Sequence, residues 1–425
     1  MNNKTTAYKQ TEVGLIPSDW EVTSFEMISD KSKKWSITGG PFGSNLKVSD
    51  YTNDGVQIVQ LQNIGDGIFL NESQVFTSEE KANELLSCNI YPNEIIISKM
   101  GDPVARACFI PNLAKRYLMA SDGIRLVVNE KEFSKKFIHD YINSVYFRKR
   151  AFENSRGSTR LRIGLPELKS LAVIKPTLAE QTAIANALTD ADALISSLEK
   201  LISKKRNIKQ GAMQKLLEPK EGWEVKKLGD LTKVFTKQTG FDYTAYIKPS
   251  LVQYRTDDTI PFIQNKDFNN RWINFDTDYF IPKNIAIQFP KILLNEKSLL
   301  ISISGSVGNV GLFDSQELAF IGGAVAILKF KVPDLIDWVM FYLKSVDGQK
   351  KLLDNVKAGS HQNLILDDIR KIEIVFPPKE ERTCIDIILS DMDSEIKALE
   401  SKLGKYKKVK LGMMQELLTG KIRLI

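Results

Sequence analysis

Apolar residues recur at a helical spacing in two long segments of the chain. In the first segment the intervals alternate between four and three positions, at Ile184, Leu188, Ala191, Ile195, Leu198 and Ile202. The second segment shows the same spacing at Ile385, Leu389, Met392, Ile396, Leu399 and Leu403. This heptad pattern predicts two amphipathic helices, each with one apolar seam that needs a partner helix.

The two segments also repeat each other in sequence. A shift of 201 positions aligns residues 175–220 with 376–421 without a gap, and 18 of the 46 aligned positions are identical. The segments end in GAMQKLLEPK (211–220) and GMMQELLTGK (412–421), and weaker matches upstream include IIISKMGDPVARACF (95–109) with LLISISGSVGNVGLF (299–313). The chain is therefore predicted to be a tandem duplication, in which each copy is a diverged domain followed by a better preserved helical tail.

Each helical tail has the other tail as its obvious partner, because matched seams of one chain can pack together. A helix of about 40 residues spans roughly 60 Å. We expect the two helices to be antiparallel, as a twofold axis crossing the rod would require, with one domain at each end. Homodimerisation through either helix is the alternative interpretation.

Local signals set the ends of the two predicted helices. Thr177 and Glu180 have the spacing of a capping box at the start of the first helix. Pro219 stops this helix before a short link, whereas Gly420 is the candidate C-cap of the second helix.

The segments between the helical tails predict strands, because they contain short β-branched runs bounded by Gly, Asn and Asp. These runs are GVQIVQL (55–61), EIIISKM (94–100), GIRLVVNE (123–130), TIPFIQN (259–265), SLLISIS (298–304) and GAVAILKF (323–330). Residues 133–152 and 334–346 predict helices. The fold class is therefore α/β (α+β), organised as a first mixed domain (1–175), a central helical spacer (176–218), a second mixed domain (219–376) and a distal helical spacer (377–425).

Composition places the chain among soluble globular proteins. It has 425 residues, of which 43% are hydrophobic and 26% charged. There is no apolar run of the roughly 18 residues that a membrane span needs, and no signal-peptide core at the N-terminus. Cys88, Cys108 and Cys384 are far apart and odd in number. We interpret them as buried, reduced thiols of a cytoplasmic protein.

The sequence lacks the familiar motifs for catalysis and metal binding. There is no G-x-x-x-x-G-K-[ST] phosphate loop and no Asx-Pro-Pro-aromatic motif for amino-methyl transfer. His139 and His361 cannot form a zinc site with such scattered cysteines. Pro333-Asp334 has no nearby E-x-K partner that would suggest a nuclease. The sequence is typical of a binding protein, with no metal expected.

The basic residues suggest what is bound. The net charge is +7 and the pI is about 8.9, which permits a nucleic-acid partner. The stretch RKRAFENSRGSTRLR (148–162) is strongly basic, and the second copy carries Lys350, Lys351, Lys357, His361, Arg370 and Lys371 in the corresponding region. Such clusters suit contact with phosphates, and a solvated helix end is the alternative for each cluster alone.

Amide and basic side chains on or beside strand ends are candidates for reading base edges. Together with the basic clusters they give the candidate DNA-contacting residues Lys47, Gln60, Gln62, Asn63, Lys99, Arg106, Arg156, Ser158, Arg160, Gln264, Asn265, Lys266, Asn309, Ser360 and His361.

At full length, the chain resembles the specificity subunits of type I restriction-modification systems. The resemblance rests on the order of GLIPSDWEV (14–22), GSTRLRIGLPELKSLAVIKPTLAEQTAIANALTDADALI (157–195), GWEVKKLGDL (222–231), GSHQNLILDDIRKIEIVFPPKEERTCIDIILSDMDSEI (359–396) and MMQELLTGKIRL (413–424). It implies two target recognition domains, each of which reads one half of a split DNA sequence, and a coiled-coil spacer that fixes the gap between the halves.

The resemblance also implies the partners of the chain. Methylation would belong to separate modification subunits, usually two, which carry S-adenosylmethionine and dock on the coiled coil and flanking helices. Cleavage and translocation would belong to restriction subunits, so this chain would hold no cofactor and no catalytic site. The alternatives are a coiled-coil adaptor that joins two protein-binding domains without DNA, and an enzyme with an unrecognised site.

Overall fold

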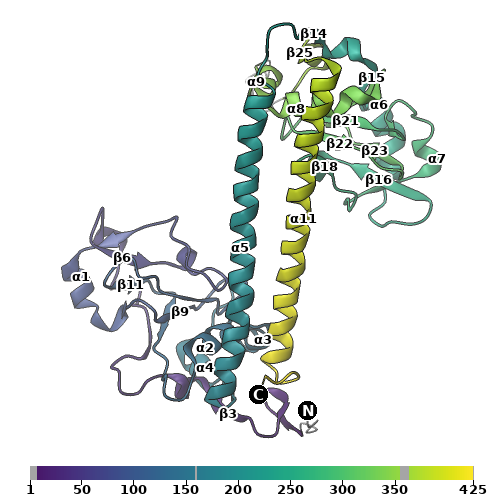
Figure 1. Cartoon of the computed structure of the whole chain (residues 1–425). Helices are drawn as coiled ribbons and strands as arrows, with labels where there is room; N and C mark the ends of the chain where they lie inside the picture. The colour runs from purple at the N-terminus through teal and green to yellow at the C-terminus, as the bar shows by residue number, and fades with distance from the viewer. Residues whose placement is uncertain (1–6, 158–159, 355–362, 425) are drawn as a thin grey trace. The chain divides into compact units, whose positions relative to one another are not determined.

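A computed structural model describes residues 7–157, 160–354 and 363–424 (Figure 1). The chain forms two compact units, of which the first comprises Met1–Leu198 with Leu403–Ile425 and the second comprises Glu199–Lys402. The unit boundaries fall inside two 39-residue helices, α5 (Leu178–Leu216) and α11 (Lys379–Leu417). Each unit therefore contains one mixed domain, the first part of the helix that follows it and the last part of the other helix.

The first unit contains thirteen strands among its described residues: β1 (Tyr8–Thr11), β2 (Gly14–Pro17), β3 (Glu21–Ser24), β4 (Ile37–Gly39), β5 (Tyr51–Thr52), β6 (Val56–Val59), β7 (Phe76–Thr77), β8 (Asn89–Ile90), β9 (Ile95–Ser98), β10 (Ala107–Phe109), β11 (Tyr117–Met119), β12 (Gly123–Leu126) and β13 (Ala172–Lys175). Its short helices are α1 (Glu79–Glu84), α2 (Lys135–Ile142), α3 (Val145–Glu153) and α4 (Leu165–Ser170). The two main sheets have the strand orders β10-β9-β12-β4 and β5-β7-β6-β11-β8, and β13 pairs with β3.

The second unit has a matching set of strands: β14 (Glu224–Lys227), β15 (Thr232–Lys237), β16 (Thr259–Ile263), β17 (Phe268–Asn269), β18 (Trp272–Ile273), β19 (Phe280–Pro282), β20 (Leu293–Leu294), β21 (Ser298–Ser302), β22 (Val310–Phe313), β23 (Ala319–Ile321), β24 (Val325–Phe330) and β25 (Glu373–Phe376). Its short helices are α6 (Gly240–Asp242), continued by a π-helix (Tyr243–Ile247), α7 (Lys283–Ala286), α8 (Ile336–Lys344), α9 (Val346–Leu353) and α10 (Leu366–Arg370).

The sheets of the two units share their topology. The order β22-β21-β24-β15 repeats β10-β9-β12-β4, and β19-β16-β23-β20 repeats β7-β6-β11-β8. The parallel pair of the smaller sheet is also repeated, because β6 runs parallel to β11 and β16 runs parallel to β23. In addition, the pairing of β14 with β25 repeats that of β3 with β13. The duplication in the sequence is thus a duplication of the fold.

The long helices run antiparallel within each unit. In the second unit, Lys220 pairs with Glu381, Lys209 with Asp393, and Lys205 with Glu395. As the residue numbers rise along α11, the numbers of their partners on the α5 side fall, which is the pattern of antiparallel helices. In the first unit, Lys410 pairs with Asp192 in the same antiparallel sense.

Most of the predicted seam residues are buried. The buried ones are Ile184, Leu188, Leu198, Ile202, Ile385, Leu389 and Ile396, whereas Ile195, Leu399 and Leu403 are half-buried. The cluster around Ile184 and Leu188 also includes Leu417 and Leu418, from the end of α11. In the second unit, Ile385 and Leu389 share a cluster with Met213 and Leu217, from the end of α5 and the residue after it. Each domain core thus extends into the helix pair, which anchors the helices to the sheets.

The strands and helices expected from sequence are present, except that one expected helix is interrupted. The six apolar runs form β6, β9, β12, β16, β21 and β24. The single helix expected over residues 133–152 was wrong in one respect: it is divided into α2 and α3 at Asn143 and Ser144. The Ser144 hydroxyl accepts a hydrogen bond from the Phe147 N–H (3.3 Å) and caps α3, which starts a new helix instead of continuing the first.

Two smaller expectations need correction. Cys88 and Cys108 are buried and free, but Cys384 is exposed on α11, because the heptad pattern places it away from the seam. Only half of the expected capping box forms: the Thr177 hydroxyl accepts from the Glu180 N–H (3.3 Å), but the Glu180 carboxylate binds Trp20 and Arg423 instead. Gly420 has the left-handed backbone (φ 70°) expected of a C-cap, just beyond α11. Among the described residues, no helix is both long and apolar enough to cross a membrane.

Candidate nucleic-acid interface

Five strand ends of the first unit converge at one edge of its sheets. The Val59 carbonyl at the end of β6 accepts from the Ala120 N–H (2.9 Å), which follows β11. The Gly40 N–H, which follows β4, donates to the Gly123 carbonyl at the start of β12 (2.9 Å). A Cβ at Gly40 would lie 1.8 Å from the Ala120 carbonyl oxygen, so this close approach requires glycine. We call this edge, with the residues that follow its strands, the first strand-end surface.

Lys99, which follows β9, belongs to the first strand-end surface, since its N–H donates to the Asp122 carbonyl (2.7 Å). Its ammonium group donates to the Ser121 carbonyl (2.9 Å), and among the described residues it forms no ion pair. Burial, followed by the charge of Arg162, lowers the pKa of Lys99, while Asp122 opposes this shift. Arg162 itself pairs with Asp122 (2.7 Å). A partly buried cation held only by a carbonyl oxygen is a strong candidate for contact with an anion.

The loop residues predicted from the basic cluster border the same surface. Arg162 forms isolated β-bridges with Met100 and with Arg156, which brings this loop beside Lys99. Arg156 is 85% exposed at its side chain and touches Glu167 (3.3 Å), and Arg160 is exposed. Ser158 lies outside the described residues. Arg106 occupies the turn after Lys99, and its Nε is buried without a hydrogen-bond partner among residues 7–157, 160–354 and 363–424.

The predicted amide residues of the first unit have different roles. Gln60, which follows β6, is half-buried and donates to the Tyr51 hydroxyl (3.4 Å). Gln62 is exposed and donates to Ser73 (2.6 Å). Asn63, by contrast, is buried, and its amide donates to the carbonyls of Leu70 (2.9 Å) and Ser73 (2.8 Å). The geometry therefore favours a structural role for Asn63, because contact with a base would require breaking the loop that it holds.

Lys47 is exposed and lies in the turn before β5, the strand that carries Tyr51. The two arginines of the RKR stretch (148–150) form hydrogen bonds within the unit. Arg148 donates to Asp66 and to Asn143, and Arg150 donates to the Ala172 carbonyl. These two arginines therefore stabilise the fold, and the cations of the surface come from the strand ends and the 156–162 loop.

The second unit has an equivalent surface with different chemistry. Gln264 follows β16, and the Gly322 N–H donates to the preceding Ile263 carbonyl (2.7 Å), as Ala120 does to Val59. The Ser302 N–H donates to the Asn309 carbonyl (2.9 Å), which repeats the bond from the Ser98 N–H to the Arg106 carbonyl (2.8 Å). Asn309 therefore occupies the place of Arg106. We call this edge the second strand-end surface.

Amides dominate the second strand-end surface. The Asn265 amide donates to the Ser304 carbonyl, while its Oδ1 is buried and has no hydrogen-bond partner in the part of the chain that the structure describes. Asn309 is exposed, and its amide reaches the Ser306 carbonyl (3.4 Å). Lys266 forms an ion pair with Asp278, so its charge is compensated. Ser360 and His361 lie outside the described residues.

One residue of the second surface was missed from sequence. Gln238 is only 4% exposed, and neither its amide nitrogen nor its oxygen has a hydrogen-bond partner among the described residues. The β-register places it where the first unit has Gly40, because Lys237 pairs with Ala326 as Gly39 pairs with Ile124. A buried amide without partners costs free energy unless a ligand satisfies it. Aligning the strand ends of the two copies would have revealed this glutamine.

The two units thus present homologous surfaces, basic in the first and rich in amides in the second. No group of three or more His, Cys, Asp or Glu residues suited to a metal ion occurs within the described ranges. Such a tandem of matched strand-end surfaces on one helix pair defines a duplicated recognition protein. The family model described as the type I restriction modification DNA specificity domain matches the chain twice, at residues 27–209 and 220–408. The chain belongs to this family.

Two curated relatives match over nearly the full length, and a third over most of it. The chain is 24% identical to the putative type I restriction enzyme MjaX specificity subunit of Methanocaldococcus jannaschii, over 98% of this chain and 97% of the relative. It is 20% identical to the MjaIX specificity subunit of the same organism, over 99% and 97% of the two chains. The EcoBI specificity subunit of Escherichia coli is 22% identical, over 80% and 74%.

Solved structures agree on the fold. The S subunit of the type I restriction-modification system from M. genitalium superposes with a TM-score of 0.55 and 16% identity, covering 98% of this chain and 97% of that chain. A chain from a structural study of complex assembly and conformational transition in the type I R-M system gives a TM-score of 0.54 and 13% identity, covering 96% and 99%.

Proposed function

We propose that this chain is the DNA-reading subunit of a type I restriction-modification complex, in which each unit reads one half of a bipartite target. The observation that carries the proposal is the repetition of one strand-end surface in both units of a chain that twice matches the DNA specificity family. The surfaces differ in chemistry, which suits two halves of different sequence. Basic groups pair with guanine edges and phosphates, whereas Asn and Gln pair with adenine edges.

In this proposal the helix pair α5–α11 is a spacer that sets the distance between the two half-sites. Two domains that read separate segments of a duplex must be held at a fixed distance and phase. A packed helix pair satisfies this requirement, and a flexible linker does not. The exposed faces of the pair and the flanking helices would dock the modification subunits, in two copies that match the twofold repeat.

The methyl transfer would occur in those modification subunits, which would supply S-adenosylmethionine, and cleavage would occur in restriction subunits. This chain would contribute binding and orientation. An adaptor that joins two protein-binding domains without DNA has no specific observation in its favour, since it would not explain the match to the DNA specificity family in both copies.

Mapping of methylated positions in the host genome tests the proposal and should give one bipartite motif with a fixed gap. Gel-shift titrations of the complex on that motif should show specific binding with a steep negative salt dependence. Exchanging residues 1–175 for those of another family member should change one half of the motif only. The proposal fails if the complex of this chain with its modification subunits does not bind any duplex specifically.

The spacer role has its own test in Leu198→Lys, which introduces a charge at a buried position of α5. The substitution should abolish methylation of the bipartite motif. Lys115→Asn, at an exposed position in the loop before β11 and outside the helix pair, should leave methylation intact.

A further inference from the structure

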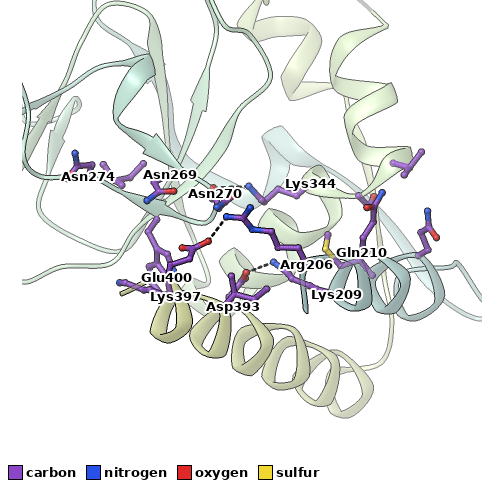
Figure 2. Close-up of a pocket in the computed structure, with 17 residues that line it drawn as sticks. Arg206, Lys209, Gln210, Asn269, Asn270, Asn274, Lys344, Asp393, Lys397 and Glu400 are labelled. Carbon is purple, nitrogen blue, oxygen red and sulfur yellow. Dashed lines mark hydrogen bonds and ion pairs between the residues drawn. The ribbon is translucent and has the colours of Figure 1, made fainter. Parts of the chain in front are cut away.

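A cavity of about 420 Å³ lies in the second unit, between the helix pair and the mixed domain (Figure 2). It is lined by α5 and α11, by the turn between β17 and β18, and by the junction of α8 with α9. Trp272, Met213 and Ile396 provide apolar surface, while amides of Asn269, Asn274 and neighbouring residues provide hydrogen-bonding groups. The volume falls in the range of small-molecule sites, and the mixed lining is typical of them.

Two of the four cations at this cavity are compensated by carboxylates. Arg206 pairs with Glu400 (2.6 Å), and Lys209 pairs with Asp393, as the dashed lines of Figure 2 show. Both pairs cross from α5 to α11 and therefore hold the helices together.

The other two cations, Lys344 and Lys397, form no ion pair with any described residue. The Lys344 ammonium donates to the carbonyls of Asn270 (2.8 Å) and Val310 (3.1 Å). The Lys397 ammonium lies 4.3 Å from the centre of the Trp272 ring. The cavity therefore carries a positive charge that the protein does not neutralise.

The internal repeat shows that this charge is not needed by the scaffold. A shift of 201 positions places Asn143 at the position of Lys344 and Ser196 at that of Lys397. The scaffold pair of Lys209 with Asp393, in contrast, is retained as Lys410 with Asp192. Both uncompensated cations are thus specific to the second unit, and the neutral residues of the first unit show that the fold tolerates their loss.

The environment of Lys344 penalises its charge. Burial, and then the charge of Lys209, lowers the pKa of Lys344 to about 8. An anion in the cavity would relieve this penalty, because an opposite charge nearby favours the ammonium form. The first turn of α9 adds a favourable field, since Ser345 and Val346 line the cavity at the positive end of this eight-residue helix.

We propose that this cavity binds a phosphate group, held by Lys344 and Lys397 and carried either by a free nucleotide or by the backbone of bound DNA. Lysines bind phosphate as point charges, and a phosphate monoester at neutral pH has the charge to match two of them. The amide side chains would bond the oxygens or an attached base, and the apolar surface would cover the remainder. The DNA-backbone source rests on the proposed function, whereas the free-nucleotide source does not.

Isothermal titration calorimetry of the full chain with AMP and with inorganic phosphate at low ionic strength tests whether the cavity binds the phosphate of a free nucleotide. Binding of AMP should weaken roughly tenfold between pH 7 and pH 9 as Lys344 deprotonates, because the AMP phosphate is already largely ionised at pH 7 and changes little in charge above it. Lys344→Arg should bind without this pH dependence. Lys344→Asn and Lys397→Ser, which copy the first unit, should each weaken binding by roughly tenfold. Lys200→Asn, the same charge change at an exposed position of α5, should bind like the unmodified chain.

If AMP and phosphate do not bind, duplex binding by the complex tests whether the cavity holds a phosphate of the DNA backbone. In complex with its modification subunits, the Lys344→Asn chain should then bind its target duplex with a salt dependence reduced by about one phosphate contact. Lys115→Asn, the same charge change in the exposed loop before β11, should leave it unchanged. The cavity proposal is overturned if Lys344→Asn reduces neither the binding of free anions nor the salt dependence of duplex binding. If the unmodified complex does not bind the duplex, the proposed function is overturned. The cavity proposal is then decided by the AMP result alone.

Discussion

Lys209 on α5 forms an ion pair with Asp393 on α11, and both side chains are largely buried in the second unit, at 12% and 8% exposure. The repeat converts this pair into Asp192 on α5 and Lys410 on α11, which form the equivalent ion pair in the first unit. The duplication has thus preserved one contact across the helix pair, with the charges exchanged between the two helices.

Asp393→Asn is expected to destabilise the second unit. The substitution leaves the buried Lys209 without its carboxylate and removes the charge that faces Arg271 at 3.7 Å. Breaking a buried ion pair from one side should lower the free energy of unfolding by roughly 3–5 kcal/mol, measured by urea denaturation. Glu395→Gln is the control, since its pair with Lys205 is exposed and worth at most about 1 kcal/mol. Equal losses in the two variants would contradict the prediction.

Arg423→Met is expected to destabilise the first unit. Arg423 donates to the carboxylates of Glu180 (2.8 Å) and Asp19 (2.9 Å). Glu180 is fully buried, and within the described part of the chain its carboxylate has the Trp20 indole (2.8 Å) as its one further partner. The variant leaves a buried carboxylate without its cation, at a cost of roughly 3 kcal/mol in unfolding free energy. Lys421→Met, whose partner Glu416 is at 3.5 Å on the surface, should change stability little. Thermal unfolding of both variants would show whether the difference exists.

Asp386 should make stability depend on pH. Burial, and then repulsion by Asp337, raises the pKa of Asp386 to about 7, and its Oδ1 has no hydrogen-bond partner. The folded chain therefore binds this proton more tightly than the unfolded chain, so the contribution of Asp386 to stability is full below about pH 4 and is lost as pH rises through 7.

The repeat supplies the replacement that tests this pH dependence, because the first unit has Ala185 at the equivalent position. Asp386→Ala should exceed the unmodified chain in stability by roughly 1–3 kcal/mol at pH 8, and this advantage should shrink as pH falls toward 4. Asp391→Ala, at an exposed position of the same helix, should show no such trend. Chemical denaturation at a series of pH values measures both, and a pH-independent difference would refute the assignment.

Arg106→Asn should alter recognition of the first half-site only. The substitution gives the first strand-end surface the residue that the second has at Asn309, and it removes one cation. The salt slope of duplex binding should fall by about one, and methylation should lose discrimination in one half of the motif. Asn309→Arg should act on the other half. An effect of either variant on both halves would contradict independent reading by the two units.

Much of this architecture could be predicted from sequence, because it depends on local periodicity. The seam through Ile184, Leu188 and Ile195 and the β-branched runs such as Ile95–Ser98 record how successive side chains face a core. The duplication showed that the same fold must occur twice. Gln60, Lys99 and Gln264 were also found correctly at strand ends, since a strand that stops at a polar residue leaves that residue at the sheet edge.

The tertiary structure decided what depends on residues far apart along the chain. Glu180 was expected to cap its own helix, but a buried carboxylate gains more from Arg423, which lies 243 residues away. The sequence suggests that Asn63 is exposed and contacts a base, but its side-chain amide is hydrogen-bonded to the Leu70 carbonyl of its own loop. Periodicity cannot reveal such choices, because burial and charge compensation are set by the neighbours that folding brings together. By itself, then, the sequence determined the duplicated domains and the helix pair, whereas only the folded chain decided which of their polar groups remain free to bind.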